Sequence, residues 1–222
     1  MAHFESWPKY KIRNSPGVRN TSKPMTFLMQ LNCCDVKPLT SCGLFPETGL
    51  LSFFVGVEQN QLVLDTNDAP IGRIVYSNSS HFDLERFEFP RNLYYLNQLP
   101  PTSMKMEQSV SVSEEILVEL VERLNPDSMD PTVDVRTLYH HEIRRRECHK
   151  MFGYPTWEEL DILEEYSQLV YTTSPQPFHA CDWVLLLEFD LGELEIQNSG
   201  SLCFFIHQTD LLMMDFKNTI CL

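Results

Sequence analysis

The stretch that decides the fold of this chain runs from Trp183 to Ile206 and has the sequence WVLLLEFDLGELEIQNSGSLCFFI. It contains two short apolar runs, joined by a polar connection that carries Gly200. Each run is too short for a typical helix and is rich in branched and aromatic residues, which favours β-strands. We therefore predict two buried strands joined by a turn.

A similar pattern occurs near the N-terminus, where an apolar run over 27–32 precedes a second one over 49–55. Phe27 precedes Leu185 by 158 positions, and Gly49 precedes Gly200 by 151. Only the connection differs in length between the two copies, and loops tolerate such insertions. Two matched blocks in the same order favour an internal duplication over the chance likeness of any two β-hairpins.

Polar residues interrupt the first strand of each block at matching places. Gln30 corresponds to Glu188, and Asn32 corresponds to Asp190. If the two copies meet around a pseudo-two-fold axis, these four side chains are candidates to line a ligand pocket at the junction. They are our predicted ligand-binding residues.

The middle of the chain has a helical pattern. Ser111 and Glu114 have capping-box spacing, and an apolar stripe follows as far as Leu124. Further helices are predicted over 134–150 and 157–168, and a short helical turn is predicted over 209–214. The expected fold is α+β, with internally duplicated, mostly antiparallel sheet halves and a helical segment between them. As one domain over 1–222, it divides into an irregular lead-in (1–24), a first β-rich half (25–100), a helical connection (101–170) and a second β-rich half (171–222).

Composition limits the classes of partner. The 222 residues are 43% hydrophobic, which is enough for a core, and the net charge is −14 from 31 acids against 17 Lys and Arg. Such a charge repels nucleic acid and anionic lipid. It serves solubility, or it favours a basic protein partner. No nucleic acid or membrane partner is therefore expected, and the oligomeric state is left open.

Cysteine usage and the chain start indicate a reduced, cytoplasmic protein. The seven cysteines are an odd number and include no C-x-x-C. The first residues contain no apolar segment typical of a secretory signal, and no apolar run approaches the length of a membrane span.

The chain resembles the YwqG-like family of uncharacterised proteins. The resemblance rests on five blocks in order: 27–31, 46–55, 73–76, 149–155 and 183–211. It implies a cytosolic α+β protein with duplicated, mostly antiparallel sheet, and it transfers no catalytic residue. Family members often occur near contact-dependent toxin genes, which implies an immunity or protein-binding role. One departure is Phe152, where the family has the first Gly of a Gly-Gly pair, so a close-approach turn is expected to differ here.

The sequence contains no strong motif for a metal site, a reactive thiol or a catalytic centre. His140, His141, Cys148 and His149 surround an Arg triplet and have spacings too long for one ion, so no metal site is predicted. The segment 65–68 lacks the later Gly and Glu of a calcium loop and is predicted to be a turn. Cys33-Cys34 has only Lys37 nearby to lower a thiol pKa. No nucleophile elbow or phosphate loop occurs, and no catalytic residue or cofactor is predicted.

Acidic residues gather on the predicted helix that follows Ser113. Glu114, Glu115, Glu119 and Glu122 form either a solvated face or a docking face for a basic partner. Our preferred hypothesis is a non-enzymatic, cytosolic protein that binds another protein through this acidic surface, with toxin immunity as one form. The alternative is a small-molecule-binding protein or an enzyme with a pocket between the duplicated halves.

Overall fold

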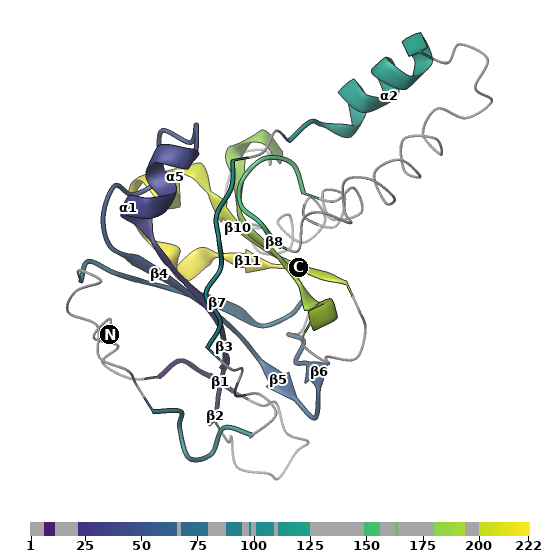
Figure 1. The fold of residues 1–222 in the computed structure, drawn as a ribbon. Coiled ribbons are helices and arrows are strands. Elements are labelled where there is room, and N and C mark those ends of the chain that lie inside the picture. Colours follow the sequence, from purple (N-terminus) through teal and green to yellow (C-terminus); the bar gives the residue numbers. More distant parts are fainter. Residues whose placement is uncertain are drawn as a thin grey trace, which may run out of the picture.

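Two antiparallel sheets form the centre of the molecule (Figure 1). The computed structural model describes residues 7–11, 22–65, 68–79, 88–94, 98, 101–108, 111–124, 149–155, 163, 180–193 and 200–222. Within this part every strand pairing is antiparallel, and helices are few. The α+β class and the mostly antiparallel sheet are therefore confirmed.

The first sheet has three strands, with β4 in the centre. In spatial order they are β3 (Thr26–Asn32), β4 (Leu50–Val55) and β7 (Gly72–Ser77). All six residues of β4 are buried, because both faces of this central strand are covered. The sequence is apolar on both faces here except at Ser52, which matches this position.

The second sheet has four strands. In spatial order they are β11 (Ile220–Cys221), β10 (Ser201–His207), β9 (Trp183–Asp190) and β8 (His149–Lys150). The helix predicted over 134–150 is wrong at its end, because His149 and Lys150 pair with Phe189 and Glu188 as an edge strand. The rest of that prediction lies outside the described residues, as does the helix predicted over 157–168 except for the helical, buried Leu163.

Shorter elements complete the described part. The short strands are β1 (Lys9–Lys11), β2 (Ser22–Pro24), β5 (Val57–Glu58) and β6 (Gln61–Leu62). The α-helices are α1 (Cys33–Val36), α2 (Glu114–Leu124) and α5 (Gln208–Leu212). Turns of 3-10 helix span Lys37–Leu39, Ala180–Asp182, Leu191–Glu193 and Phe216–Asn218. In Figure 1, α2 extends beyond the sheets, whereas α5 lies beside them.

The N-terminal segment is less irregular than expected. Strands β1 and β2 pair with each other, and the Trp7 indole N–H donates to the Met25 carbonyl at 2.8 Å. Trp7 also packs edge-on against Phe54 with ring centroids 5.5 Å apart. The expectation of an irregular lead-in over 1–24 is therefore corrected for residues 7–11 and 22–24, which cover the outer face of the first sheet.

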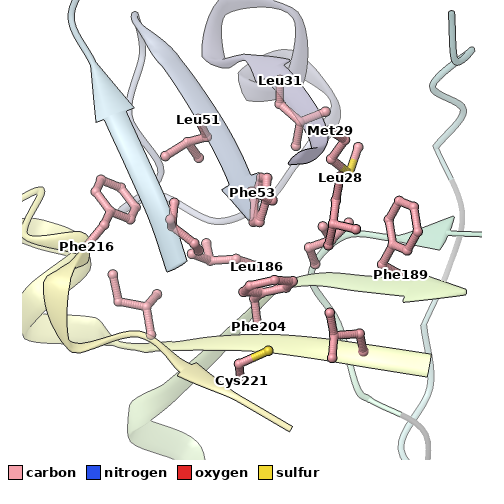
Figure 2. Close-up of a cluster of buried hydrophobic side chains, with 14 of the residues drawn as sticks. Leu28, Met29, Leu31, Leu51, Phe53, Leu186, Phe189, Phe204, Phe216 and Cys221 are labelled. Atoms are coloured by element: carbon pink, nitrogen blue, oxygen red, sulfur yellow. The ribbon is translucent and has the colours of Figure 1, made fainter. Parts of the chain in front are cut away.

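The main core lies between the two sheets. Figure 2 shows Phe53 of β4 facing Phe204 of β10 across this space, and their ring centroids are 5.3 Å apart. Met29 and Leu31 enter the same cluster from β3, and Phe189 enters it from β9. Complete burial of a side chain of this size contributes about 2 kcal/mol to stability, so this interface holds the sheets together.

The two long hairpins have the same register. In β3, Leu28 is an extra residue between two paired neighbours, and in β9 Leu186 is the extra residue. Leu186 is the position that the sequence matching assigns to Leu28. The flanking pairs also correspond: Phe27–Phe54 with Leu185–Phe205, Met29–Phe53 with Leu187–Phe204, Gln30–Ser52 with Glu188–Cys203, and Asn32–Leu50 with Asp190–Ser201.

The correspondence continues past the hairpins. Ile74 pairs with Phe53 on the far side of β4, and Cys221 pairs with Phe204 on the far side of β10. A helical turn follows the first strand in both sheets, as α1 after β3 and as Leu191–Glu193 after β9. Each sheet therefore contains a three-stranded unit with the same order, the same bulge and the same following turn.

Candidate functional site

Gln30 and Asn32 lie at the end of β3. The Gln30 amide donates to the buried Ser52 hydroxyl at 2.8 Å. Asn32 caps α1: its side chain accepts from the Cys34 backbone N–H at 3.2 Å and donates to Asp35 at 3.0 Å. Both side chains therefore have structural partners in their own hairpin.

Glu188 lies in the middle of the second sheet and forms an ion pair with Lys150. The Lys150 ammonium is 3.0 Å from a Glu188 carboxylate oxygen, and the two side chains are only 12% and 11% exposed. The register explains the contact, because Lys150 on β8 is directly opposite Glu188 on β9. The sequence pattern predicts a helix at Lys150 and therefore does not indicate this ion pair.

Asp190 ends β9 in the same way that Asn32 ends β3. One carboxylate oxygen of Asp190 accepts from the Gly192 backbone N–H at 2.8 Å, so it begins the turn over Leu191–Glu193. The Asp190 backbone N–H donates to Nδ1 of His149 at 3.2 Å. The His149 ring stacks on Phe189, with centroids 4.2 Å apart. His149 thus fixes the edge of this sheet, while His140, His141 and Cys148 lie outside the described residues.

The structure does not bring the two polar pairs together. Successive side chains of a strand point to opposite faces. Met29, Leu31 and their counterparts in β9 fill the space between the sheets (Figure 2). Gln30 and Glu188 therefore lie on the outer faces of their sheets, with the apolar core between them. The predicted single pocket lined by all four residues is not formed, and a ligand-binding role for either pair alone stays a prediction.

The predicted acidic face lies on α2. Glu119 and Glu122 are exposed, and Glu119 forms an ion pair with Arg123 one turn later. The side chains of Glu114 and Glu115 lie outside the described part. The helix begins at Glu114, two residues later than the capping-box spacing of Ser111 and Glu114 predicts, and the Ser113 carbonyl accepts its first hydrogen bond, from the Leu117 N–H.

The apolar stripe of α2 is partly open to solvent. Ile116 is 48% exposed and Leu120 is 45% exposed. A surface helix normally turns such a stripe toward a core. Carboxylates and uncovered aliphatic side chains thus occur together on this helix, an arrangement that suits non-covalent binding of a protein.

A second exposed apolar group, which the sequence pattern does not indicate, lies at the C-terminal end of α5 and in the turn that follows it. Leu212, Met213 and Met214 are 64%, 71% and 50% exposed. The predicted helical turn over 209–214 is confirmed as α5 and the turn that ends it. The exposure of Leu212, Met213 and Met214 could not be predicted, because leucine and methionine are residue types that are usually buried.

The described residues contain no group of three or more His, Cys, Asp or Glu side chains placed to hold a metal ion. Their six cysteines are all free thiols. Burial raises the pKa of Cys33 to about 12, and the neighbouring Cys34 adds to the shift. A low-pKa reactive thiol is therefore not found at Cys33. No helix in the described part is long and apolar enough to cross a membrane.

Comparison with known proteins places the chain in a family. No curated protein matches it. The family model described as a domain of unknown function, DUF1963, matches residues 1–222. The match covers the whole chain, including both sheets, α2 and the turn after α5. The chain therefore belongs to the DUF1963 family.

Proposed function

We propose that this protein acts without catalysis, by binding another protein through an acidic surface that includes α2. The observation that carries the proposal is the combination on this helix of exposed Ile116 and Leu120 with exposed Glu119 and Glu122. Apolar side chains supply affinity when a partner removes them from water, and carboxylates around them select a basic partner. Glu114 and Glu115 belong to the same proposed surface.

The charge of the whole molecule supports this choice of partner. A net charge of −14 attracts a basic protein at long range and increases the rate of encounter. The same charge opposes binding to phosphate-rich surfaces. The attraction is screened by salt, so the association rate is expected to fall as ionic strength rises.

The test is affinity purification from the native host, followed by binding measurements with charge-reversed variants. The variant Glu119→Lys/Glu122→Lys is compared with Glu47→Lys/Glu88→Lys, which reverses two exposed acids outside α2 and leaves the same net charge. We expect the α2 variant to weaken binding about tenfold or more and the control to change it much less. Full reversal of Glu114, Glu115, Glu119 and Glu122 should weaken it further. Equal affinities for the α2 and control variants would refute the proposed surface.

Toxin immunity is the specific form of this function that we propose. The resemblance to the YwqG-like family supports it, as does the acidic surface, because a basic toxin domain would be a matched partner. The proposed location is the cytoplasm, where six free thiols in the described part would stay reduced. If a toxin gene lies beside the gene of this protein, co-expression of the protein should restore growth of cells that express the toxin. The variant Glu119→Lys/Glu122→Lys should lose this protection, and the variant Glu47→Lys/Glu88→Lys should keep it.

We also infer that the two sheets descend from a duplicated unit. The inference is supported by the shared hairpin register, by the bulges at Leu28 and Leu186, and by the matched caps Asn32 and Asp190. Bulges are specific features that homologous strands retain. In this view the matched polar residues are inherited structural positions, which favours protein binding over the alternative of a pocket between the halves.

A further inference from the structure

The turn that ends α5 is unusual in its chemistry. The Asp215 N–H donates to the Asp210 carbonyl at 2.9 Å, and the Met214 N–H donates to the Leu211 carbonyl at 3.0 Å. These two bonds form a Schellman motif, in which the residue before the last donor adopts the left-handed conformation. Glycine is the usual residue at that position, but here Met214 occupies it with a φ of 54°. A large side chain is thus held in an unfavourable backbone conformation and projects into solvent.

The neighbouring side chains extend this apolar surface. Leu212 and Met213 precede Met214, and all three are at least half exposed. Leu211, by contrast, is fully buried and fixes α5 to the main core. Buried Leu211 therefore holds the turn in place, while the apolar side chains of Leu212, Met213 and Met214 remain exposed to solvent. Flexible methionines are well suited to a surface that packs against a partner.

Charge indicates what could cover this surface. Asp210 and Asp215 flank the three apolar residues, and Lys217 is the nearest cation in the sequence. A second copy of the chain would bring two molecules of charge −14 together and place the same aspartates opposite each other in a two-fold contact. A protein segment with apolar side chains beside Lys or Arg would complement both the exposed apolar residues and the flanking aspartates.

We propose that Leu212, Met213 and Met214 form a docking surface for a protein segment that carries apolar side chains next to basic ones. This surface is separate from the acidic face of α2 and depends on different residues. The left-handed Met214 is retained at the expense of folding stability because its side chain contacts the partner. Replacement by glycine should therefore stabilise the protein and weaken docking at the same time.

The test uses a synthetic amphipathic peptide of leucine and lysine as the probe, followed through the methionine methyl signals by NMR. Two control peptides replace every lysine by glutamate or every leucine by serine. We expect the probe to shift the signals of Met213 and Met214 and to leave Met104 and Met106, which are exposed elsewhere, nearly unchanged. This readout separates the site from any binding of the basic peptide at α2. Neither control peptide should shift the two signals.

Variants complete the test. Met213→Ser and Met214→Gly should each weaken peptide binding about tenfold, whereas Met104→Ser should not change it. Met214→Gly should also raise the unfolding temperature, which shows that its loss of binding is not a loss of folding. The proposal is overturned if Met213 and Met214 do not respond, if Met104 and Met106 respond equally, or if Met214→Gly binds as tightly as the natural protein. Sedimentation showing a dimer that Met213→Ser dissociates would also overturn it, in favour of a second copy.

Discussion

The adjacent residues Cys33 and Cys34 show how burial separates two chemically identical side chains. Cys33 is fully buried at the start of α1, whereas Cys34 is exposed. With its pKa raised to about 12, Cys33 is ionised in roughly one molecule in ten thousand at pH 8. We expect iodoacetamide to alkylate Cys34 and the exposed Cys181 at that pH and to leave Cys33 unmodified. Peptide mass spectrometry measures the labelling, and denaturant provides the control in which all three react.

The same shift has a consequence for stability at alkaline pH. The thiol of Cys33 ionises near its usual value of 9.0 in the unfolded chain but only near pH 12 in the folded one. Above about pH 9 the unfolded state releases this proton first and is favoured. The contribution of Cys33 is therefore complete below pH 9 and is lost as the pH rises toward 12. A urea midpoint that does not decrease between pH 8 and pH 10 would contradict this expectation.

At the scale of elements, the caps of the two sheets offer a direct comparison. Asn32 and Asp190 each accept a hydrogen bond from the backbone N–H two residues later. Loss of such a cap costs about 1 kcal/mol. Asn32→Ala and Asp190→Ala should each lower the free energy of unfolding by this amount, and the double variant should lose the sum because the sites lie in different sheets. Chemical denaturation of the three variants measures these losses. If removal of a cap does not change the free energy of unfolding, the turn does not depend on that cap.

The ion pair between β8 and β9 leads to a different expectation. Removal of one partner leaves the other charge poorly solvated, because both side chains are almost 90% buried. Lys150→Met should therefore destabilise the protein by about 3 kcal/mol, and Lys150→Met/Glu188→Leu should recover much of the loss. Urea unfolding of the single and double variants measures the coupling. If the double variant is no more stable than Lys150→Met, the two charges do not depend on each other.

The sequence predicts these elements to different extents, for physical reasons. Strands β9 and β10 are long and apolar, so their pattern alone identifies them. The two residues of β8 are polar and become a strand only because Phe189 and Glu188 lie opposite them. Matching also finds that Gln30 and Glu188 are equivalent. The sequence does not show that both side chains point away from the core. The alternation of apolar and polar residues shows which side chains share a face of a strand, but not which face the other sheet covers.

At the scale of the whole molecule, the approach of the two sheets depends on Gly72 at the start of β7. A Cβ atom at this position would lie 2.5 Å from both Cβ and Sγ of Cys221 in β11, and 2.8 Å from the ring of Phe204 in β10. These distances are far below van der Waals contact, so a side chain at Gly72 would push the sheets apart. The packing of Phe53 on Phe204 would be disturbed with it, since both belong to the same interface.

We therefore expect Gly72→Ala to destabilise the protein by about 1–3 kcal/mol, as overpacked cores do. Gly43→Ala is the matched control, because no atom lies within 4 Å of a Cβ at that exposed position. Urea denaturation compares the two. In the background of Cys221→Gly, which removes both the Cβ and the Sγ atom that a side chain at position 72 would meet, Gly72→Ala should cost less stability than in the natural protein, because residues in contact are not additive. Independent costs for the two substitutions would mean that β7 and β11 do not approach as described, and the face-to-face arrangement of the sheets would have to be abandoned at this corner.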